Sequence, residues 1–160
     1  MSWTDLLPAG ATARAGGDVD TKELAGLARA VEMEYEGEAR RTAADLEHDL
    51  SAPGFDPSED VMRVWNADGL LVAAGIAHYR EPWVSSFTEI HVLPDTERGA
   101  LIRVIEAWAR ELGTSRIDKA PEGAQVGMAV GTHGDDLEVA DIITRLGLSL
   151  KHIRRCRRRL

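Results

Sequence analysis

Residues 86–113 read SFTEIHVLPDTERGALIRVIEAWARELG and contain the clearest structural pattern in the chain. The apolar run from Phe87 to Leu93 predicts a β-strand, which Pro94 ends. After Pro94, apolar residues return with the spacing of an α-helix that Gly113 is expected to end; they are Leu101, Ile105, Trp108 and Leu112. The segment therefore predicts a strand, a tight loop and a helix, in that order.

The loop between this strand and this helix carries Arg98, Gly99 and Ala100. The first N–H groups of a helix have no partner within the helix, and the positive end of the helix dipole lies beside them. Main chain, dipole and the Arg98 guanidinium could together hold an anion such as a phosphate. An ordinary turn between strand and helix, which occurs in many unrelated proteins, is the more common explanation of the same residues.

The composition is that of an ordinary globular protein with one domain. The chain has 160 residues, of which 44% are hydrophobic and 29% charged. It has a single cysteine, Cys156, and neither a run that resembles a signal peptide nor an apolar stretch near the roughly 20 residues that span a bilayer. We therefore expect a cytoplasmic protein with no membrane contact. The five histidines show no close pairing, so we expect no metal.

The charge is unevenly distributed along the chain. Six of the 19 basic residues lie in the last ten, KHIRRCRRRL, which leaves 13 basic against 27 acidic residues in positions 1–150. The basic segment could bind nucleic acid or another anionic partner, but the acidic body would repel phosphate, so nucleic acid is unlikely. The alternative is a last strand or tail whose arginines pair with the acidic body.

The first half of the chain predicts two helices and an antiparallel meander. Residues 1–11 are expected to be a loose lead-in, followed by a short strand at residues 12–15. Helices should start at Asp20 and at Thr42, each with an acidic residue three positions later. Glu32 to Glu38 end the first helix and could attract a cationic amine, although a solvated acidic helix end is the simpler reading.

Strands are predicted at residues 61–65 and 70–79, joined by the hairpin turn at Asp68 and Gly69. Gly75 marks a packing constraint, a bulge or a surface that something else approaches. A strand at residues 125–130, a helix capped by Asp135 or Asp136 and a final strand at residues 148–156 complete the chain. The fold class is therefore α+β, with a mixed, mostly antiparallel sheet of about six to seven strands and helices on both faces.

Three segments carry a resemblance to a known family. They are residues 45–77, DLEHDLSAPGFDPSEDVMRVWNADGLLVAAGIA; residues 90–113, IHVLPDTERGALIRVIEAWARELG; and residues 140–160, ADIITRLGLSLKHIRRCRRRL. With the order of elements, they resemble the GCN5-related N-acetyltransferase (GNAT) family, and most of all the N-terminal half of two-domain actinobacterial members of the mycothiol synthase type. The resemblance covers roughly residues 12–160, which it makes a single domain.

The resemblance implies acetyl-CoA or another acyl-CoA as co-substrate. Its pantetheine would pair with the strand end at His91, Val92 and Leu93, and its pyrophosphate would rest on the loop at Arg98, Gly99 and Ala100. A substrate amine would attack the thioester carbonyl directly, after losing a proton to a base. Glu89 and His91 are the candidate catalytic residues.

The chain departs from the family pattern at three places. The loop from Asp95 to Ala100 is about two residues shorter than is usual, and its Glu97 would repel a pyrophosphate. Ile143 occupies the position of the usual tyrosine acid. Two-residue alternation places Glu89 on the opposite face from the common glutamate positions, which fall at Ser86 and Thr88.

Three functions follow from these observations. The first is an acyl-CoA-dependent N-acetyltransferase for an amine of a small molecule or peptide, with a degenerate phosphate loop. The second is a catalytically inactive domain of the same fold that acts as a scaffold, with a second GNAT-like domain or a second copy as its partner. The third is a binder of anionic partners through Arg154 to Arg159.

Overall fold

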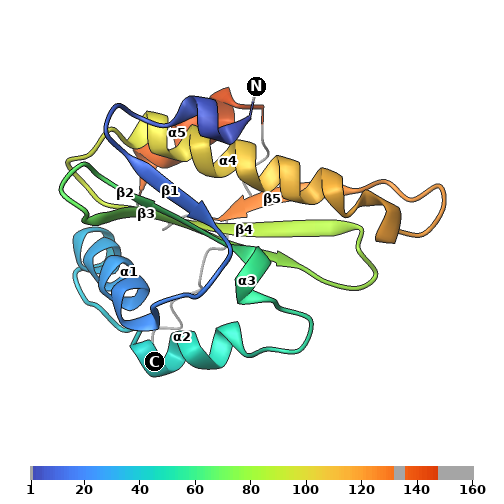
Figure 1. Ribbon diagram of the computed structural model, residues 1–160, viewed down its shortest axis with the longest axis horizontal. Coiled ribbons are helices and arrows are strands. Elements are labelled where there is room, and N and C mark those ends of the chain that lie inside the picture. The colour runs from blue at the N-terminus through green and yellow to red at the C-terminus, as the bar shows by residue number, and fades with distance from the viewer. Residues whose placement is uncertain (1, 132–135, 148–160) are drawn as a thin grey trace, which may run out of the picture.

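The computed structural model describes residues 2–131 and 136–147 and contains a twisted sheet between two layers of helices (Figure 1). The strands of the sheet are ordered β1-β2-β3-β4-β5. The first four strands pair antiparallel with their neighbours, and β5 pairs parallel to β4. Their bounds are β1 Thr12–Ala15, β2 Val61–Trp65, β3 Leu71–Tyr79, β4 Ser85–Val92 and β5 Gly127–Gly131. The α+β class and the mixed, mostly antiparallel sheet are confirmed.

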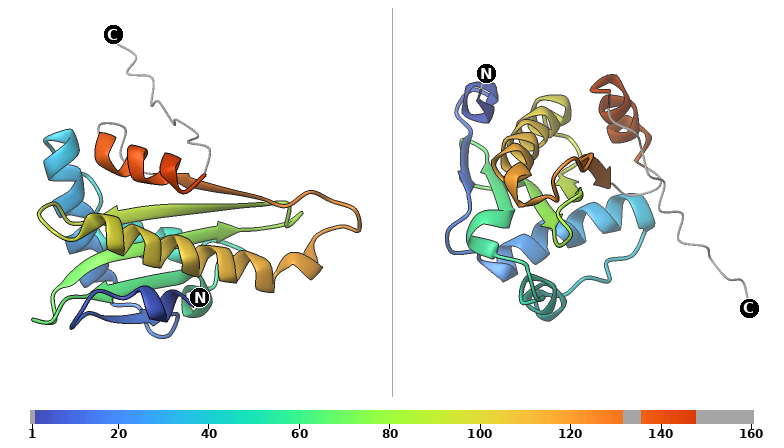
Figure 2. Two further views of the ribbon diagram at one scale, coloured as in Figure 1. Left: turned by 90° about the horizontal axis from the view of Figure 1, so that it is seen from above. Right: turned by 90° about the vertical axis from the view of Figure 1, so that its right-hand side faces the viewer.

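Helices cover both faces of the sheet, as predicted. Helices α4 and α5 lie on one face, whereas α1 and α2 lie on the other, an arrangement that the further views also show (Figure 2). The helices are α1 Thr21–Glu36, α2 Ala43–Leu50, α3 Pro57–Asp60, α4 Arg98–Ser115 and α5 Leu137–Arg145, with 3₁₀ turns η1 Trp3–Leu6 and η2 Ile117–Lys119. None of the helices in residues 2–131 and 136–147 is long and apolar enough to cross a membrane.

The two faces of the sheet bury separate hydrophobic cores. The core under α4 and α5 is built around Ile102, Ile105, Trp108 and Ile143, which pack on Ile90 and Val92 of β4. The core under α1 and α2 is built from Leu24, Leu27, Val31, Leu46 and Leu50, which pack on Val61, Ala74 and Ile76. Successive residues of β3 therefore alternate between the two cores, with Ala73 and Ala77 in the first and Ala74 and Ile76 in the second, as the pleat of a strand requires.

Side chains cap the helices where the sequence predicts. The Asp20 carboxylate accepts hydrogen bonds from the main-chain N–H groups of Lys22 and Glu23 at 2.9 and 3.2 Å. Thr42 and Asp45 form a reciprocal capping box at the start of α2. These caps satisfy N–H groups that have no partner within the helix, which is why a local pattern of three or four residues suffices to locate them.

Two predicted boundaries were wrong. Residues 1–11 were expected to be a loose lead-in, but Trp3, Leu6 and Leu7 pack against the core under α4, and the Trp3 main-chain N–H donates to Glu111 at 3.2 Å. Helix α4 runs through Gly113 to Ser115. A glycine inside a helix costs only about 1 kcal/mol relative to alanine, which the packing of α4 offsets.

Some predicted features fall outside the described residues. The final strand at residues 148–156, the basic segment at residues 151–159 and Cys156 are among them. Residues 2–131 and 136–147 contain five strands, and the predicted sixth strand is the one at residues 148–156. The prediction that the basic segment binds an anionic partner therefore stays a prediction.

Gly75 on β3 is the point of closest approach between the sheet and α4. A Cβ atom built on Gly75 would lie 2.5 Å from Cγ2 of Ile105 and 3.0 Å from Cζ3 of Trp108. Real Cβ contacts are longer than this, so only glycine lets the helix lie this close to the strand. The packing reading of Gly75 is the one that the structure supports, because the irregularity between β2 and β3 lies at Val64 and Trp65 instead.

We predict that Gly75→Ala lowers the free energy of unfolding by about 1–3 kcal/mol, because the added methyl group overpacks the core under α4. Urea denaturation measures this change. In a double-mutant cycle, Ile105→Ala should cost less in the Gly75→Ala background than alone, because it removes the clashing Cγ2 atom. Gly127→Ala is the control, since a Cβ there meets no atom within 4 Å. Equal losses of unfolding free energy in Gly75→Ala and Gly127→Ala would contradict the close packing of α4 on Gly75.

Candidate functional site

Strands β4 and β5, at one side of the sheet in the described residues, separate part-way along β4. Their parallel register begins at Ser85 with Gly127 and ends at Glu89 with Gly131. Strand β4 continues to Val92, and these last residues still pair with β3, from Ala73 opposite Val92 to Gly75 opposite Ile90. In the described residues, one edge of β4 is thus without a strand partner beyond Glu89.

Main-chain groups alternate between the two edges of β4. The main-chain N–H of Leu93 donates to the carbonyl of Val72 on β3 at 2.9 Å. Since hydrogen-bonded and non-hydrogen-bonded pairs alternate along an antiparallel ladder, the main chain of His91 also faces β3. The main chain of Ile90 faces the last paired residue of β5, Gly131, and that of Val92 faces the open edge. Of the predicted set His91, Val92 and Leu93, only Val92 presents its main chain to this edge.

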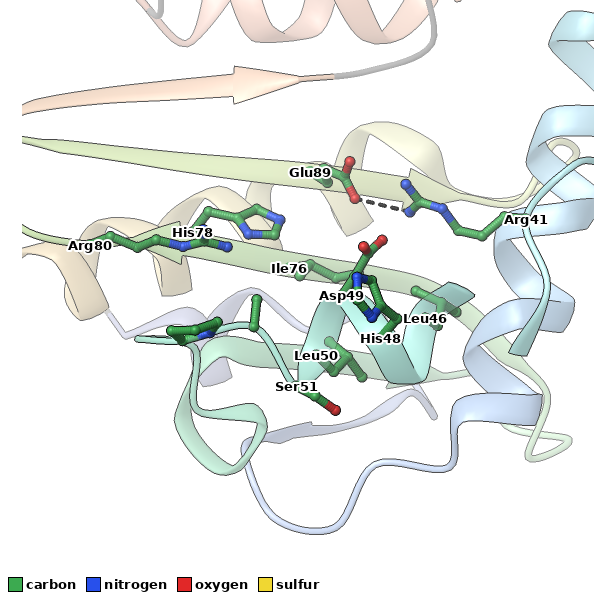
Figure 3. A pocket seen from close by; sticks show the side chains of 12 residues that line it. Arg41, Leu46, His48, Asp49, Leu50, Ser51, Ile76, His78, Arg80 and Glu89 are labelled. Atoms are coloured by element: carbon green, nitrogen blue, oxygen red, sulfur yellow. Dashed lines mark hydrogen bonds and ion pairs between the residues drawn. The ribbon is translucent and has the colours of Figure 1, made fainter. Parts of the chain in front are cut away.

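A cleft of about 440 Å³ lies on the other side of β4, between α2 and strands β3 and β4 (Figure 3). Glu89 is at the level where β4 and β5 separate, so the cleft lies next to the open strand edge. Polar and charged side chains from α2, β3 and β4 enter the cleft above an apolar wall. Its lining residues are Arg41, Leu46, His48, Asp49, Leu50, Ser51, Ala52, Pro53, Ile76, His78, Arg80 and Glu89.

Glu89 is held between two nitrogen groups. Nη1 of Arg41 donates to Oε2 of Glu89 at 3.1 Å, and Nε2 of His91 lies 3.6 Å from the same oxygen. Burial favours a higher pKa of the Glu89 carboxyl, but the hydrogen bonds and charges of His91 and Arg41 outweigh it and hold the pKa well below its ordinary value of 4.5. The carboxylate is therefore ionised at neutral pH and is a weak base.

The position of Arg41 depends on a buried carboxylate of α1. Oε2 of Glu32 accepts hydrogen bonds from the main-chain N–H groups of Arg40 and Arg41 at 2.7 and 3.0 Å. Glu32 is only 8% exposed, so it is a structural group and not the solvated acid that the helix end suggests. Its carboxylate fixes the loop between α1 and α2 and so places the Arg41 side chain over Glu89.

The imidazole ring of His78 packs against two phenylalanine rings. Its imidazole lies 5.5 Å from the ring of Phe55 and stacks on that of Phe87 with centroids 6.1 Å apart. Burial lowers the pKa of His78, and Arg80 adds to this, while Glu89 opposes it. The ring is therefore neutral at pH 7 and, within the cleft, has the chemistry to accept a proton, which the sequence pattern does not indicate.

Arg98 does not point into open space beside the start of α4. Its guanidinium forms ion pairs with Asp136, the N-cap residue of α5, and with Glu138, where Nη1 and Oε2 are 2.8 Å apart. The same guanidinium lies 5.1 Å from the ring centroid of Tyr35. Only 7% of the Arg98 side chain is exposed, so it joins α1, α4 and α5 as a buried cation.

The main-chain groups at the start of α4 are partly used as well. The N–H of Arg98 donates to the carbonyl of Thr96 at 2.8 Å, and the N–H of Ala100 donates to that of Glu97 at 3.0 Å. A Cβ on Gly99 would lie 4.0 Å from Cδ1 of Ile142, so α5 packs near this end of the helix. The predicted phosphate loop therefore lacks a free arginine and has few free N–H groups.

The predicted site residues fall into two groups. Glu89 and His91 lie together beside the cleft, whereas Arg98, Gly99 and Ala100 lie after the end of β4 against α5. The helix and strand periodicities predict the five described strands and the four longer helices, but they could not show that α2 faces Glu89. Among residues 2–131 and 136–147, no group of three or more histidine, cysteine or acidic side chains could hold a metal ion.

Solved structures with a similar arrangement identify the fold. A GCN5-related N-acetyltransferase from Sphaerobacter thermophilus superposes with a TM-score of 0.78 and 22% identity over 88% of this chain. The chain has the GCN5-related N-acetyltransferase fold. A protein from Salmonella typhimurium, solved with its cofactor acetyl-CoA, matches this fold with a TM-score of 0.51 and 13% identity over 86% of the chain and 79% of its own length.

The likeness to known proteins concerns the GNAT fold alone. The chain spans 44% of the length of the Sphaerobacter protein. No family model matches the sequence, and no curated protein sequence matches it. Function therefore has to be argued from the cleft and from the open edge of β4.

We predict that the stabilising effect of Glu89 is lost at low pH. Because the pKa of Glu89 is lower in the folded than in the unfolded protein, the ionised carboxylate stabilises the fold above pH 4.5, and this contribution falls as the pH drops below that value. Urea denaturation of the wild type and Glu89→Gln should show a gap in unfolding free energy that is constant near neutral pH and narrows below pH 4.5.

Glu34→Gln is the matched control for this experiment, because Glu34 is an exposed carboxylate on α1. A gap between wild type and Glu89→Gln that keeps its size from neutral pH into the acid range would contradict the role assigned to Arg41 and His91.

Proposed function

We propose that the chain is an acyl-CoA-dependent N-acetyltransferase domain with a degenerate phosphate loop. The observation that carries the proposal is the edge of β4 at Val92, which has no strand partner within residues 2–131 and 136–147, beside a cleft that contains an ionised carboxylate and a neutral imidazole. An extended ligand with amide groups can add to such an edge through main-chain hydrogen bonds. The pantetheine arm of an acyl-CoA is a ligand of this kind.

Acyl-CoA would supply a thioester as the acyl donor, and the side chains of the cleft would prepare the amine. Glu89, oriented by Arg41 and His91, attracts the substrate ammonium and holds it at the level where β4 and β5 separate. His91 acts through Glu89 as a positioning residue. Holding the two reactants together in this way removes much of the entropic cost of the reaction.

His78 would accept the proton that the ammonium loses before it reacts. Glu89 is too weak a base for this step, because its pKa is held far below neutral pH. His78 pairs across the sheet with Phe87, two residues from Glu89, so both side chains face the same cleft. The C–N bond to the acyl group then forms as the C–S bond breaks, and the thiolate leaves and takes up a proton.

The α5 helix supplies no acid for the leaving thiolate at the family position. Ile143 is fully buried in the core under α4 and α5. Protonation of the thiolate would therefore fall to solvent or to the His78 imidazolium formed in the preceding step. Because the family position holds no acid, we expect a modest kcat.

A second candidate function is a catalytically inactive GNAT-like domain that serves as a scaffold. It is favoured by Arg98, whose guanidinium is neutralised by Asp136 and Glu138 and is not available to a pyrophosphate. The domain would then be the N-terminal half of a two-domain protein of the mycothiol synthase type, or would pair with a second copy. Its share of 44% of the Sphaerobacter protein agrees with such an arrangement.

Binding of acetyl-CoA tests the first function against the second. A ligand that binds only the folded state stabilises it by RT ln(1 + [L]/Kd), or about 2.7 kcal/mol at 100 times Kd. We therefore expect acetyl-CoA to raise the melting temperature in a thermal shift experiment. Acetyl-pantetheine, which lacks the pyrophosphate, should bind within about tenfold of acetyl-CoA, a difference of about 1.4 kcal/mol. No shift at millimolar concentrations of either compound would favour the scaffold.

Replacing His78 tests the assigned proton acceptor. We expect His78→Gln to lower kcat by about 10²–10⁴-fold, the usual contribution of general base catalysis, with little change in KM for the amine. Release of CoA from acetyl-CoA with a panel of amines provides the measurement. His48→Gln is the control, because His48 also lines the cleft but lies exposed on α2. A kcat equal in the two variants would remove His78 from the mechanism.

A further inference from the structure

The cleft between α2 and strands β3 and β4 is acidic at one end and basic at the other. Arg41 lies at one end and Arg80 at the other, with Asp49 and Glu89 on the Arg41 side (Figure 3). At the first end, two carboxylates face a single guanidinium, since both Asp49 and Glu89 act on Arg41 and raise its pKa against the opposing effect of burial. This end holds two carboxylates and one guanidinium, with the His91 imidazole against Glu89, and is suited to one cation.

The opposite end carries an uncompensated positive charge. Arg80 follows directly after β3 and is exposed. Within residues 2–131 and 136–147, its guanidinium forms neither a hydrogen bond nor an ion pair with another side chain, and no acidic residue of the cleft lies at its end. The adjacent Glu81 lines a separate hollow with Pro82 and Trp83. This end of the cleft is therefore suited to an anion.

Strand geometry gives the separation between the two ends. Ile76 pairs with Glu89 across the sheet, and Arg80 follows Ile76 by four residues. At a rise of about 3.4 Å per residue, the main chain at Arg80 lies about 13 Å from the level of Glu89. The Arg80 side chain runs along the cleft towards the other end and shortens this span by several Å (Figure 3). A ligand that contacts both ends must therefore be longer than a single α-amino acid.

The walls between the two ends are largely apolar. Leu46 and Leu50 of α2 face Ile76 of β3, and the stacked ring of His78 continues this surface towards Arg80. Such a surface favours a ligand with an apolar middle section and has few groups for a sugar or a nucleotide. Extended peptide covers about 3.3–3.6 Å per residue, so two or three residues fit the shortened span.

We propose that the cleft binds a short peptide of two or three residues with both termini free. Its N-terminal ammonium lies between Asp49 and Glu89, and its C-terminal carboxylate pairs with Arg80. The inference deepens the proposed function and rests on it for the reaction, because the N-terminal amine then lies at the level where β4 and β5 separate. Binding of the peptide itself does not require an acyl-CoA.

Isothermal titration calorimetry without acyl-CoA tests the carboxylate end. The probes are leucine, alanyl-leucine and alanyl-alanyl-leucine, together with the C-terminal amides of the two peptides. We expect each free peptide to bind at least about tenfold more tightly than its amide, and both to bind more tightly than leucine. Arg80→Gln should reduce the affinity for the free peptides to that for the amides and leave the amides unchanged. Arg103→Gln, an exposed arginine on α4, should change neither.

The ammonium end is tested with the same peptides. Asp49→Asn should weaken binding of the free peptide and of its amide by similar factors of about ten, and N-acetylated alanyl-leucine should not bind measurably. Glu122→Gln, in the exposed loop after η2, is the control for the loss of one carboxylate. Asp49 and Arg80 are both exposed, and melting temperatures of the variants confirm that they remain folded.

The outcomes separate this proposal from the proposed function. Amides that bind as tightly as free peptides, an Arg80→Gln variant with unchanged preference, or tighter binding of leucine than of the peptides would overturn the proposal. Peptide binding without acetyl-CoA binding would leave the peptide site in place and remove the transferase. Acetyl-CoA binding without peptide binding would overturn the peptide site and leave the proposed transferase function in place.

Discussion

The close contact between β3 and α4 at Gly75 fixes the geometry of the whole molecule. Because no side chain separates the strand from Ile105 and Trp108, the helix lies directly on the middle of the sheet. The position of α4 sets where its first turn meets the end of β4, and hence where Arg98 can reach α5. The opposite face of the same strand forms the floor of the cleft at Ile76 and His78. One glycine thus places both candidate regions relative to each other.

Local patterns in the sequence were sufficient for the elements of the fold. Asp20 and Thr42 cap their helices through atoms within three residues, and the hairpin at Asp68 and Gly69 joins strands that are neighbours in sequence. The partners of the site residues could not be predicted in this way. Arg41 lies 48 residues from Glu89, and Asp136 lies 38 residues from Arg98. Only the packing of the helices on the sheet brings these charges together.

The same limit explains why the structure gives Arg98 and Glu89 other roles than the sequence predicts. Arg98 has the sequence position of a phosphate ligand, yet its charge is used to join α4 to α5. Glu89 was a candidate base, yet Arg41 and His91 make it a stable anion. His78 gave no signal in the sequence, because a single histidine in an apolar strand is ordinary, and only its neighbours Phe55 and Phe87 show that it faces the cleft as a neutral ring.

The hydrogen bonds of Glu32 have an effect beyond the loop that they hold. A single oxygen of this side chain receives the N–H groups of two successive residues, Arg40 and Arg41, so the chain after α1 has little freedom to shift. The last turns of α1 therefore determine where Arg41 lies, and so the charge at that end of the cleft, although no residue of α1 lines it. Variation in that helix can retune ligand preference while every residue in contact with the ligand stays the same.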